Sequence, residues 1–162
     1  MLHPLRLLCL GYGLIVVLML SACTSSLIPN TDVEDTARNR GVVEFMEVYR
    51  RAVERQDIEL LLQLAHPDYY EDGGNIDATD DLDRAGLAEY LHGKFAEAKA
   101  IRYEIRYRRV GVGRNDSLYI DYTYSASYQL PGEGGDKWQR TVAENRVELV
   151  PHGDGFLILS GM

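Results

Sequence analysis

Histidine and cysteine, which hold transition metals and act in nucleophilic catalysis, are scarce in this sequence, with four and two residues. Outside the N-terminal leader described below, the histidines are His66, His92 and His152, and none has a second His or Cys at the spacing of a metal site. No Gly-rich phosphate loop, nucleophile elbow or Cys/His pair is present. The sequence therefore predicts no metal site and no cofactor.

Tyrosines and one asparagine are the polar side chains that recur on apolar faces. Tyrosine is favoured in strands for packing alone, but its hydroxyl usually finds a hydrogen-bond partner when the ring is buried. Asn145 is an amide on an otherwise apolar strand face, so either it donates hydrogen bonds in a pocket or that face is wetter than the pattern indicates. We expect a pocket lined by Tyr49, Tyr103, Tyr107, Tyr122, Tyr124 and Asn145.

Two helices with a short break between them are expected to position Tyr49. From Gly41 onward apolar residues recur at helical spacing, and Tyr49 lies on this stripe. Asp57 is placed to cap a second, Leu-rich helix, which Pro67 should end. Asp83 is placed to cap a third. The charged face of the first helix is expected to be solvated; its residues are Glu44, Glu47, Arg50, Arg51, Glu54 and Arg55.

The sequence period changes from helix to strand after Ala100. Alternating apolar and polar residues predict strands over 101–108, 118–128, 139–150 and 156–159, and a short extended segment over 68–72 precedes them. The fold class predicted is α+β: three N-terminal helices packed in the concave face of a curved, mostly antiparallel sheet. We expect this sheet to form a cone-shaped barrel with a pocket.

The first 22 residues have the pattern of a lipoprotein signal peptide. Arg6 supplies the positive charge, and the apolar run from Leu7 to Leu20 is shorter than the ~20 residues of a membrane-spanning helix. The run leads into Leu-Ser-Ala-Cys, which ends at Cys23 and resembles the bacterial lipobox, whose cysteine is lipidated and becomes the new N-terminus. The alternative is an ordinary signal peptide cut after Ala22, with Cys23 a bystander.

A lipid on Cys23 would hold the protein at a membrane of the cell envelope, the outer membrane facing the periplasm in a cell that has one. Residues 23–37 are polar, and we expect them to form a flexible tether to a domain over 38–162. With Cys9 in the leader and Cys23 lipidated, no thiol remains for a disulfide. The net charge of −8 opposes nucleic acid as a partner.

The order of these elements resembles that of the nuclear transport factor 2-like superfamily, which includes ketosteroid isomerase, scytalone dehydratase and SnoaL-type polyketide cyclases. The resemblance lies in residues 49–61, where helix one ends in a polar break and Asp57 before a Leu-rich helix. It continues in the entry to the first strand over 66–72 and the third helix over 83–95. The resemblance implies a pocket between helices and sheet and, as in many members, a homodimer through the outer sheet surface.

The resemblance also assigns candidate catalytic residues. In ketosteroid isomerase a tyrosine at the place of Tyr49 donates to a developing oxyanion beside a protonated aspartate, while a second aspartate acts as base. Glu71 or Asp72 lies near the place of that base, although Gly73 could equally take it. The protonated aspartate has no clear counterpart, since its approximate place falls near Asn145 or Val147, where the nearest carboxylate, Glu148, should point outward.

Two functions from different classes are therefore expected. The first is a lipid-anchored envelope domain that binds a small apolar ligand or a protein partner without catalysis. The alternative is a SnoaL-like or isomerase-like enzyme that transfers protons between Tyr49 and Glu71 or Asp72. A third possibility is a purely structural dimer, which outward apolar residues on the long strands would support.

Overall fold

The structure is a computed structural model that describes residues 26–72 and 81–162. The leader, Cys23 and Gly73 lie outside the described residues, so the expectations made for them stay predictions. Within the described part of the chain, no helix is long and apolar enough to cross a membrane.

The three expected helices are present, and side chains cap each of them. Helix α2 spans Ala37–Arg55, begins four residues earlier than the apolar stripe indicated because Thr36 caps it, and ends at Gln56. Helix α3 spans Ile58–Leu64, and Asp57 accepts a hydrogen bond from the Leu60 N–H, as predicted. Helix α4 spans Arg84–Glu97, and its predicted cap, Asp83, accepts from the Gly86 N–H.

Four long strands form one antiparallel sheet in the order β3-β4-β5-β6. Their bounds are Ala100–Val112, Leu118–Leu130, Lys137–His152 and Gly155–Ser160. Two short strands, β1 (Tyr70–Glu71) and β2 (Leu82–Asp83), pair separately. The α+β class is confirmed. The sheet is curved but open, since β3 and β6 are not paired with each other, so the barrel does not close.

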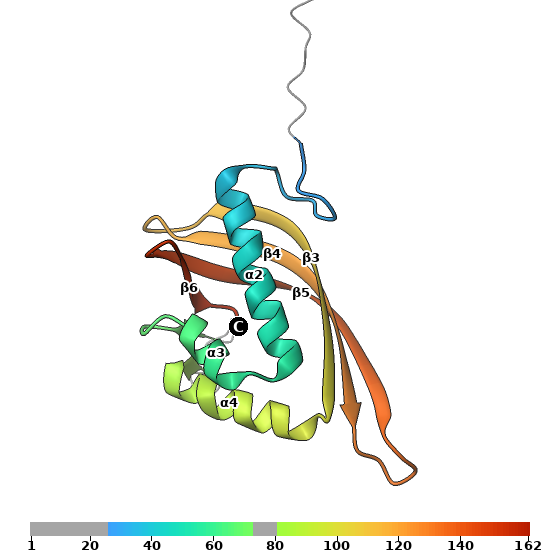
Figure 1. Ribbon diagram of the computed structural model, residues 1–162. Helices are drawn as coiled ribbons and strands as arrows, with labels where there is room; N and C mark the ends of the chain where they lie inside the picture. Colours follow the sequence, from blue (N-terminus) through green and yellow to red (C-terminus); the bar gives the residue numbers. More distant parts are fainter. Residues whose placement is uncertain (1–25, 73–80) are drawn as a thin grey trace, which may run out of the picture.

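The core lies where α2 crosses the concave face of the sheet (Figure 1). The predicted stripe of α2 is buried, including Met46, which is fully inaccessible. The alternation on the strands places their apolar residues against it, and those buried from β4, β5 and β6 include Ile120, Tyr122, Val147, Leu149 and Ile158. This packing fixes α2, and hence Tyr49, over the middle of the sheet.

Residues 26–36 are not a flexible tether but pack on β3. The Val33 side chain is only 1% exposed, and the Asp32 N–H donates to the Tyr107 carbonyl. The Asp32 carboxylate forms ion pairs at 2.8 Å with Arg106 and with Arg108. These hydrogen-bonded arginines lower the pKa of Asp32 to about 2. The ordered domain therefore begins about ten residues before the boundary expected from composition.

Candidate functional site

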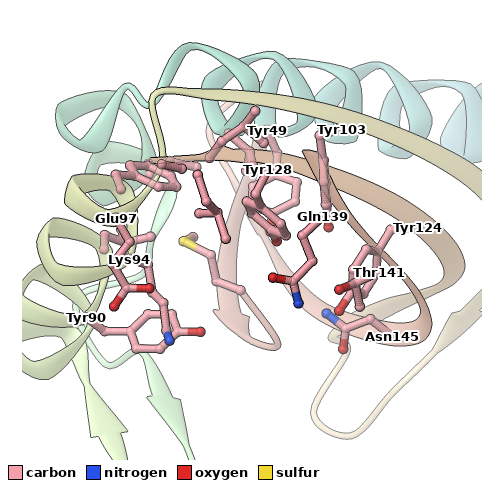
Figure 2. A pocket seen from close by; sticks show the side chains of 18 residues that line it. Tyr49, Tyr90, Lys94, Glu97, Tyr103, Tyr124, Tyr128, Gln139, Thr141 and Asn145 are labelled. Carbon is pink, nitrogen blue, oxygen red and sulfur yellow. The ribbon is translucent and has the colours of Figure 1, made fainter. Parts of the chain in front are cut away.

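A cavity of about 440 Å³ lies between α2, α3, α4 and the strands β3, β4 and β5 (Figure 2). Aromatic and aliphatic side chains supply most of its wall, and polar side chains of α4 and β5 lie around it. The lining residues are Tyr49, Val53, Leu61, Tyr90, Leu91, Lys94, Phe95, Glu97, Ala98, Ile101, Tyr103, Tyr124, Tyr128, Leu130, Gln139, Thr141, Asn145 and Met162.

Tyr49 lies at the inner end of this cavity, in a group of three tyrosines. Its ring meets that of Tyr103 edge to face, with centroids 6.3 Å apart, and the hydroxyls of Tyr103 and Tyr122 are its neighbours. Burial raises the pKa of Tyr49 well above its ordinary value, and the two neighbouring phenols raise it further. At neutral pH Tyr49 is therefore a neutral hydrogen-bond donor in an apolar wall.

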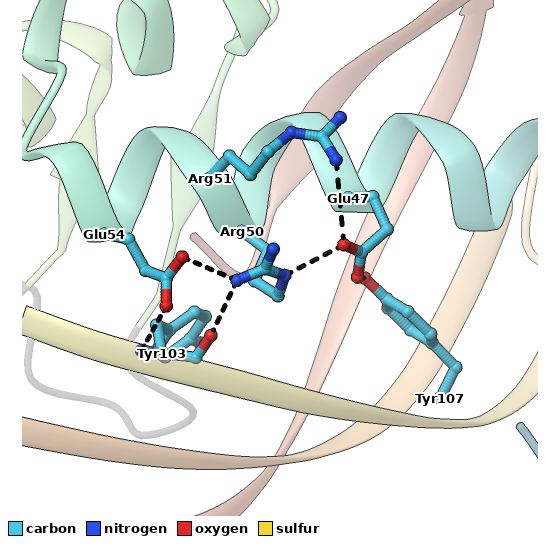
Figure 3. A network of polar contacts seen from close by, with 6 residues as sticks. All are labelled: Glu47, Arg50, Arg51, Glu54, Tyr103 and Tyr107. Atoms are coloured by element: carbon cyan, nitrogen blue, oxygen red, sulfur yellow. Dashed lines mark hydrogen bonds and ion pairs between the residues drawn. The ribbon is translucent and has the colours of Figure 1, made fainter. Parts of the chain in front are cut away.

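Side chains of α2 hold Tyr103 by its backbone (Figure 3). The Glu54 carboxylate accepts from the Tyr103 N–H at 3.1 Å, and the Arg50 guanidinium donates to the Tyr103 carbonyl at 3.1 Å. Arg50 also forms ion pairs with Glu47 and Glu54. The sequence had indicated a fully solvated face. Instead, Arg50, Glu47 and Glu54 are half-buried against the outer edge of β3, and Arg50 and Glu54 fix Tyr103 there.

Tyr107 and Tyr122 do not line the cavity, contrary to expectation. The Tyr107 hydroxyl donates to Glu47 on α2 at 2.9 Å, which turns it toward the edge of the sheet. Tyr122 is 1% exposed, and its hydroxyl accepts from the Asn145 amide at 3.0 Å. Strand alternation identifies the face of a side chain but not how far it lies from the cavity, so both were assigned to the pocket.

Asn145 connects this tyrosine group to the last residues of the chain. Its amide nitrogen donates to the Tyr122 hydroxyl and to the Gly161 carbonyl, both at 3.0 Å, while its oxygen accepts from the Arg146 N–H. The alternative left open by the sequence is thus resolved: the amide is engaged with the protein itself. Asn145 borders the cavity but acts as a structural tie.

Residues 161–162 are folded into the molecule and form part of the cavity wall. The Gly161 N–H donates to the Glu71 carboxylate, and the Met162 N–H donates to the Tyr69 hydroxyl at 3.2 Å. Gly161 has a φ of 87°, and a Cβ added there would lie 1.9 Å from the Arg146 carbonyl oxygen, so only glycine fits. The Met162 side chain thereby reaches the cavity.

The candidate bases lie elsewhere than the cavity wall. Glu71 and Asp72 are not among the lining residues, and the Glu71 carboxylate is engaged by the Gly161 N–H. Among the described carboxylates, Glu97 lines the cavity, but it is exposed at the rim of α4 near Lys94. The arrangement supplies apolar walls and neutral hydrogen-bond donors, without a buried base beside Tyr49.

Several lining residues were not proposed from the sequence. Tyr90, Lys94 and Glu97 come from α4, whose apolar pattern does not reveal which side faces a cavity. Gln139 and Thr141 lie on the same face of β5 as Asn145. Their even spacing from Asn145 was the sequence signal that could have identified them as lining residues. In the described ranges 26–72 and 81–162, no group of three His, Cys, Asp or Glu residues could hold a metal ion.

Comparison with known proteins identifies the fold. No family model and no curated protein matches this sequence. A candidate dehydratase from the NTF2-like family of Streptomyces avermitilis is 15% identical, with a TM-score of 0.59 over 76% of this chain and 92% of the other. This chain has the nuclear transport factor 2-like fold. The resemblance stated from the sequence is thereby confirmed.

Two further solved structures share this NTF2-like architecture. Kfla4162 from Kribbella flavida is 16% identical, with a TM-score of 0.61 over 76% of this chain and 86% of that one. ActVI-ORFA from Streptomyces coelicolor is 13% identical, with a TM-score of 0.59 over 78% and 95%. At these identities the likeness establishes the fold, and function has to be argued from the site.

Proposed function

We propose that this NTF2-like domain binds a small, largely apolar ligand that carries one hydrogen-bonding group. The observation that supports this most is the cavity itself. Its volume of about 440 Å³ lies within the ~300–1,000 Å³ typical of ligand sites. Most of its wall is aromatic and aliphatic, with polar side chains of α4 and β5 around it. Tyr49 and Tyr103 place neutral hydroxyls at the inner end.

The binding role is favoured over catalysis because, among the residues that the structure describes, the cavity has a donor but no buried base. A general base must lie within hydrogen-bond reach of the proton that it removes. Glu71, one of the two candidates, instead accepts a hydrogen bond from the Gly161 N–H, and neither Glu71 nor Asp72 lines the cavity. A ligand in this cavity would therefore be held by its apolar body and oriented by the tyrosine hydroxyls.

Binding of an apolar fluorescent probe tests this proposal. The domain from Ser26 onward is titrated with N-phenyl-1-naphthylamine, and the same titration is made with Thr141→Trp and Ser127→Trp. Thr141 lines the cavity, whereas Ser127 lies on the opposite face of the sheet. Saturable binding that is lost in Thr141→Trp and kept in Ser127→Trp supports the proposal, and equal binding by all three proteins refutes it.

We also propose that the domain is held at an envelope membrane by lipid on Cys23. The support is the leader pattern, with its short apolar run followed directly by the lipobox-like tetrapeptide. The chain is expressed in bacteria fed an alkyne fatty acid, and membranes are separated from soluble protein. Labelled, membrane-bound protein that becomes unlabelled in Cys23→Ser is expected. Equal labelling of both forms would contradict the proposal.

The alternative, proton transfer on a bound carbonyl compound, is favoured by one observation. Tyr49, Tyr103 and Tyr122 form a group of neutral phenols of the kind that stabilises an oxyanion. Hydrogen exchange of a cyclic ketone in D₂O, followed by NMR, separates the two functions. The binding proposal predicts exchange at the uncatalysed rate, and faster exchange that is lost in Tyr49→Phe would favour the enzyme.

A further inference from the structure

Strand β5 has a long side without a neighbouring strand. It pairs with β4 from Lys137 to Leu149 but with β6 only from Glu148 onward. Figure 1 shows this part of β5 on the side of the sheet away from α2, in a hairpin that extends beyond the helices. In the described ranges, the segment 137–145 therefore has a neighbouring segment on one side only, since Gly161 lies against the backbone at Arg146.

The two outer strands of the sheet, by contrast, have covered edges. On β3, Arg50 and Glu54 bind the backbone of Tyr103, and the N–H of Asp32 binds the Tyr107 carbonyl. On β6, the His66 N–H donates to the Ile158 carbonyl. Uncovered edges are sites of strand addition, which proteins normally prevent. The uncovered stretch of β5 thus differs from the outer edges of β3 and β6 in this sheet.

The ladder geometry identifies which backbone groups of β5 face outward. The Tyr103 N–H and C=O point away from β4, so those of its partner Ala126 point toward β5. Thr141, paired with Ala126, then points toward β4. The direction of the backbone groups alternates from residue to residue along a strand. The N–H and C=O groups of Arg140, Val142 and Glu144 therefore point outward, away from β4.

These three residues form a self-complementary series. Val142 is 58% exposed and lies between an arginine and a glutamate, each two residues away on the same face. If a second β5 is placed antiparallel with Val142 opposite Val142, then Arg140 of each copy lies opposite Glu144 of the other. This register also matches outward-facing backbone groups with outward-facing groups, as a hydrogen-bonded antiparallel pair requires.

We propose that two copies of this chain associate edge to edge through β5, antiparallel about a two-fold axis at Val142. The dimer contains one valine pair, two Arg140–Glu144 pairs and a continuous sheet of eight strands. It differs from a dimer through the outer sheet surface, because the backbone edge makes the contact. A second copy carries Arg140 and Glu144 at matching positions by symmetry. Charge complementarity therefore favours a second copy over a foreign peptide, which would need an arginine and a glutamate at the same spacing.

The dimer would also border the ligand cavity. In this register Thr141 lies opposite Ala143 of the second copy, and Gln139 lies opposite its Asn145. Gln139 and Thr141 line the cavity, so the second strand would run along its β5 side. The proposed dimer does not depend on ligand binding, and the tests below contain no ligand.

Charge reversal tests the pairing of Arg140 with Glu144. The protein mass of the full chain, solubilised in a non-ionic detergent, is measured by light scattering for wild type, Arg140→Glu, Glu144→Arg and the double variant. We expect two copies for wild type, one copy for each single variant because like charges then oppose each other twice, and two copies again for the double variant. A wild-type monomer, or a dimer unchanged by single reversals, overturns the proposal.

Disulfide trapping in membranes tests the register. Hydrogen-bonded antiparallel partners have Cα atoms ~5.5 Å apart, which suits a disulfide. Val142→Cys should therefore cross-link well above the wild-type background from Cys9 and Cys23, whereas Glu133→Cys at the hairpin tip should not. In the proposed register the Arg140 positions of the two copies lie about 13 Å apart along the strands. Arg140→Cys should therefore not cross-link alone, but it should cross-link when it is mixed with Glu144→Cys. Trapping of Val142→Cys no stronger than that of Glu133→Cys, or only onto other proteins, overturns the proposal.

Discussion

At the scale of single residues, Asn145 connects parts of the molecule that are distant in sequence. Its amide bonds Tyr122 on β4 and Gly161 at the end of the described chain, and Gly161 in turn engages Glu71. Asn145 thereby connects the cavity wall to Gly161, whose N–H engages Glu71. Both hydrogen bonds of its amide nitrogen go to the protein itself, so we expect Asn145 to maintain the shape of the site.

Replacing Asn145 should destabilise the fold more than replacing Gln139, which lies six residues earlier on the same face of β5. Asn145→Ala leaves the Gly161 carbonyl and the Tyr122 hydroxyl without their donor, and we expect a loss of about 1–3 kcal/mol in the free energy of unfolding. Urea denaturation measures it. Gln139→Ala is the control, with an expected change within about 0.5 kcal/mol; equal changes in both variants would show that the tie is unimportant.

The buried tyrosines should make the fold sensitive to high pH. Burial raises the pKa of Tyr69 to about 12, against ~10 in the unfolded chain. Above pH ~10 the folded state keeps this proton while the unfolded state loses it. The contribution of Tyr69 to stability is therefore constant below pH ~10 and is lost as the pH rises from there toward 12. Tyrosinate absorbance recorded with circular dichroism should show the buried phenols ionising only as the fold is lost.

At the scale of elements, the edge of β3 shows how a charged helix face can be structural. The half-buried Arg50, with Glu47 and Glu54, supplies partners for backbone and hydroxyl groups of β3. Arg51, one residue further on, forms only a 3.9 Å ion pair with Glu47. The helix and the edge strand are therefore joined by specific contacts in addition to the apolar packing beneath.

Removing one of these contacts should open the β3 edge locally. In Glu54→Ala the Tyr103 N–H loses its acceptor, and a hydrogen bond to a charged group is worth about 1.5–3 kcal/mol. We expect hydrogen exchange at the Tyr103 amide to become about tenfold faster or more, measured by NMR. Arg51→Ala is the matched control; if it accelerates the same amide equally, a general loosening of α2 is responsible.

The elements themselves followed from local sequence patterns. Helical and strand periods, and capping by Asp57 and Asp83, predicted the helices and the four-stranded sheet because these features depend on neighbours in the chain. Residues 26–36 were misassigned because composition alone indicated a tether. Their order depends on contacts of Asp32 with Arg106 and Arg108, which lie more than seventy positions away.

The candidate site was predictable only in outline. Placing Tyr49 on the apolar face of α2 followed from its period, and the structure puts it at the cavity. The direction of the Glu71 side chain could not be predicted from a local pattern, because it depends on the turn of the chain at Gly161. The division of the strand tyrosines between the cavity and the layer behind it likewise depends on sheet curvature, which alternation does not encode.

At the scale of the whole molecule, the chain combines an NTF2-like domain, a cavity at one end of the sheet and an uncovered edge on β5. The proposed lipid anchor would keep this domain at a membrane, where apolar compounds are concentrated. The proposed dimer would place two cavities on one continuous sheet. Both proposals are consistent with a binding role that uses the cavity without chemistry.

Methionine methyl resonances test the central claim, that the cavity binds an apolar ligand, most directly. Met46 and Met162 are the methionines of the described residues; Met162 lines the cavity, whereas Met46 lies in the closed core. The domain is labelled with ¹³C-methyl methionine and titrated with N-phenyl-1-naphthylamine. Our account predicts a saturable shift of the Met162 resonance with Met46 unmoved. An unmoved Met162 resonance at saturating probe would contradict it.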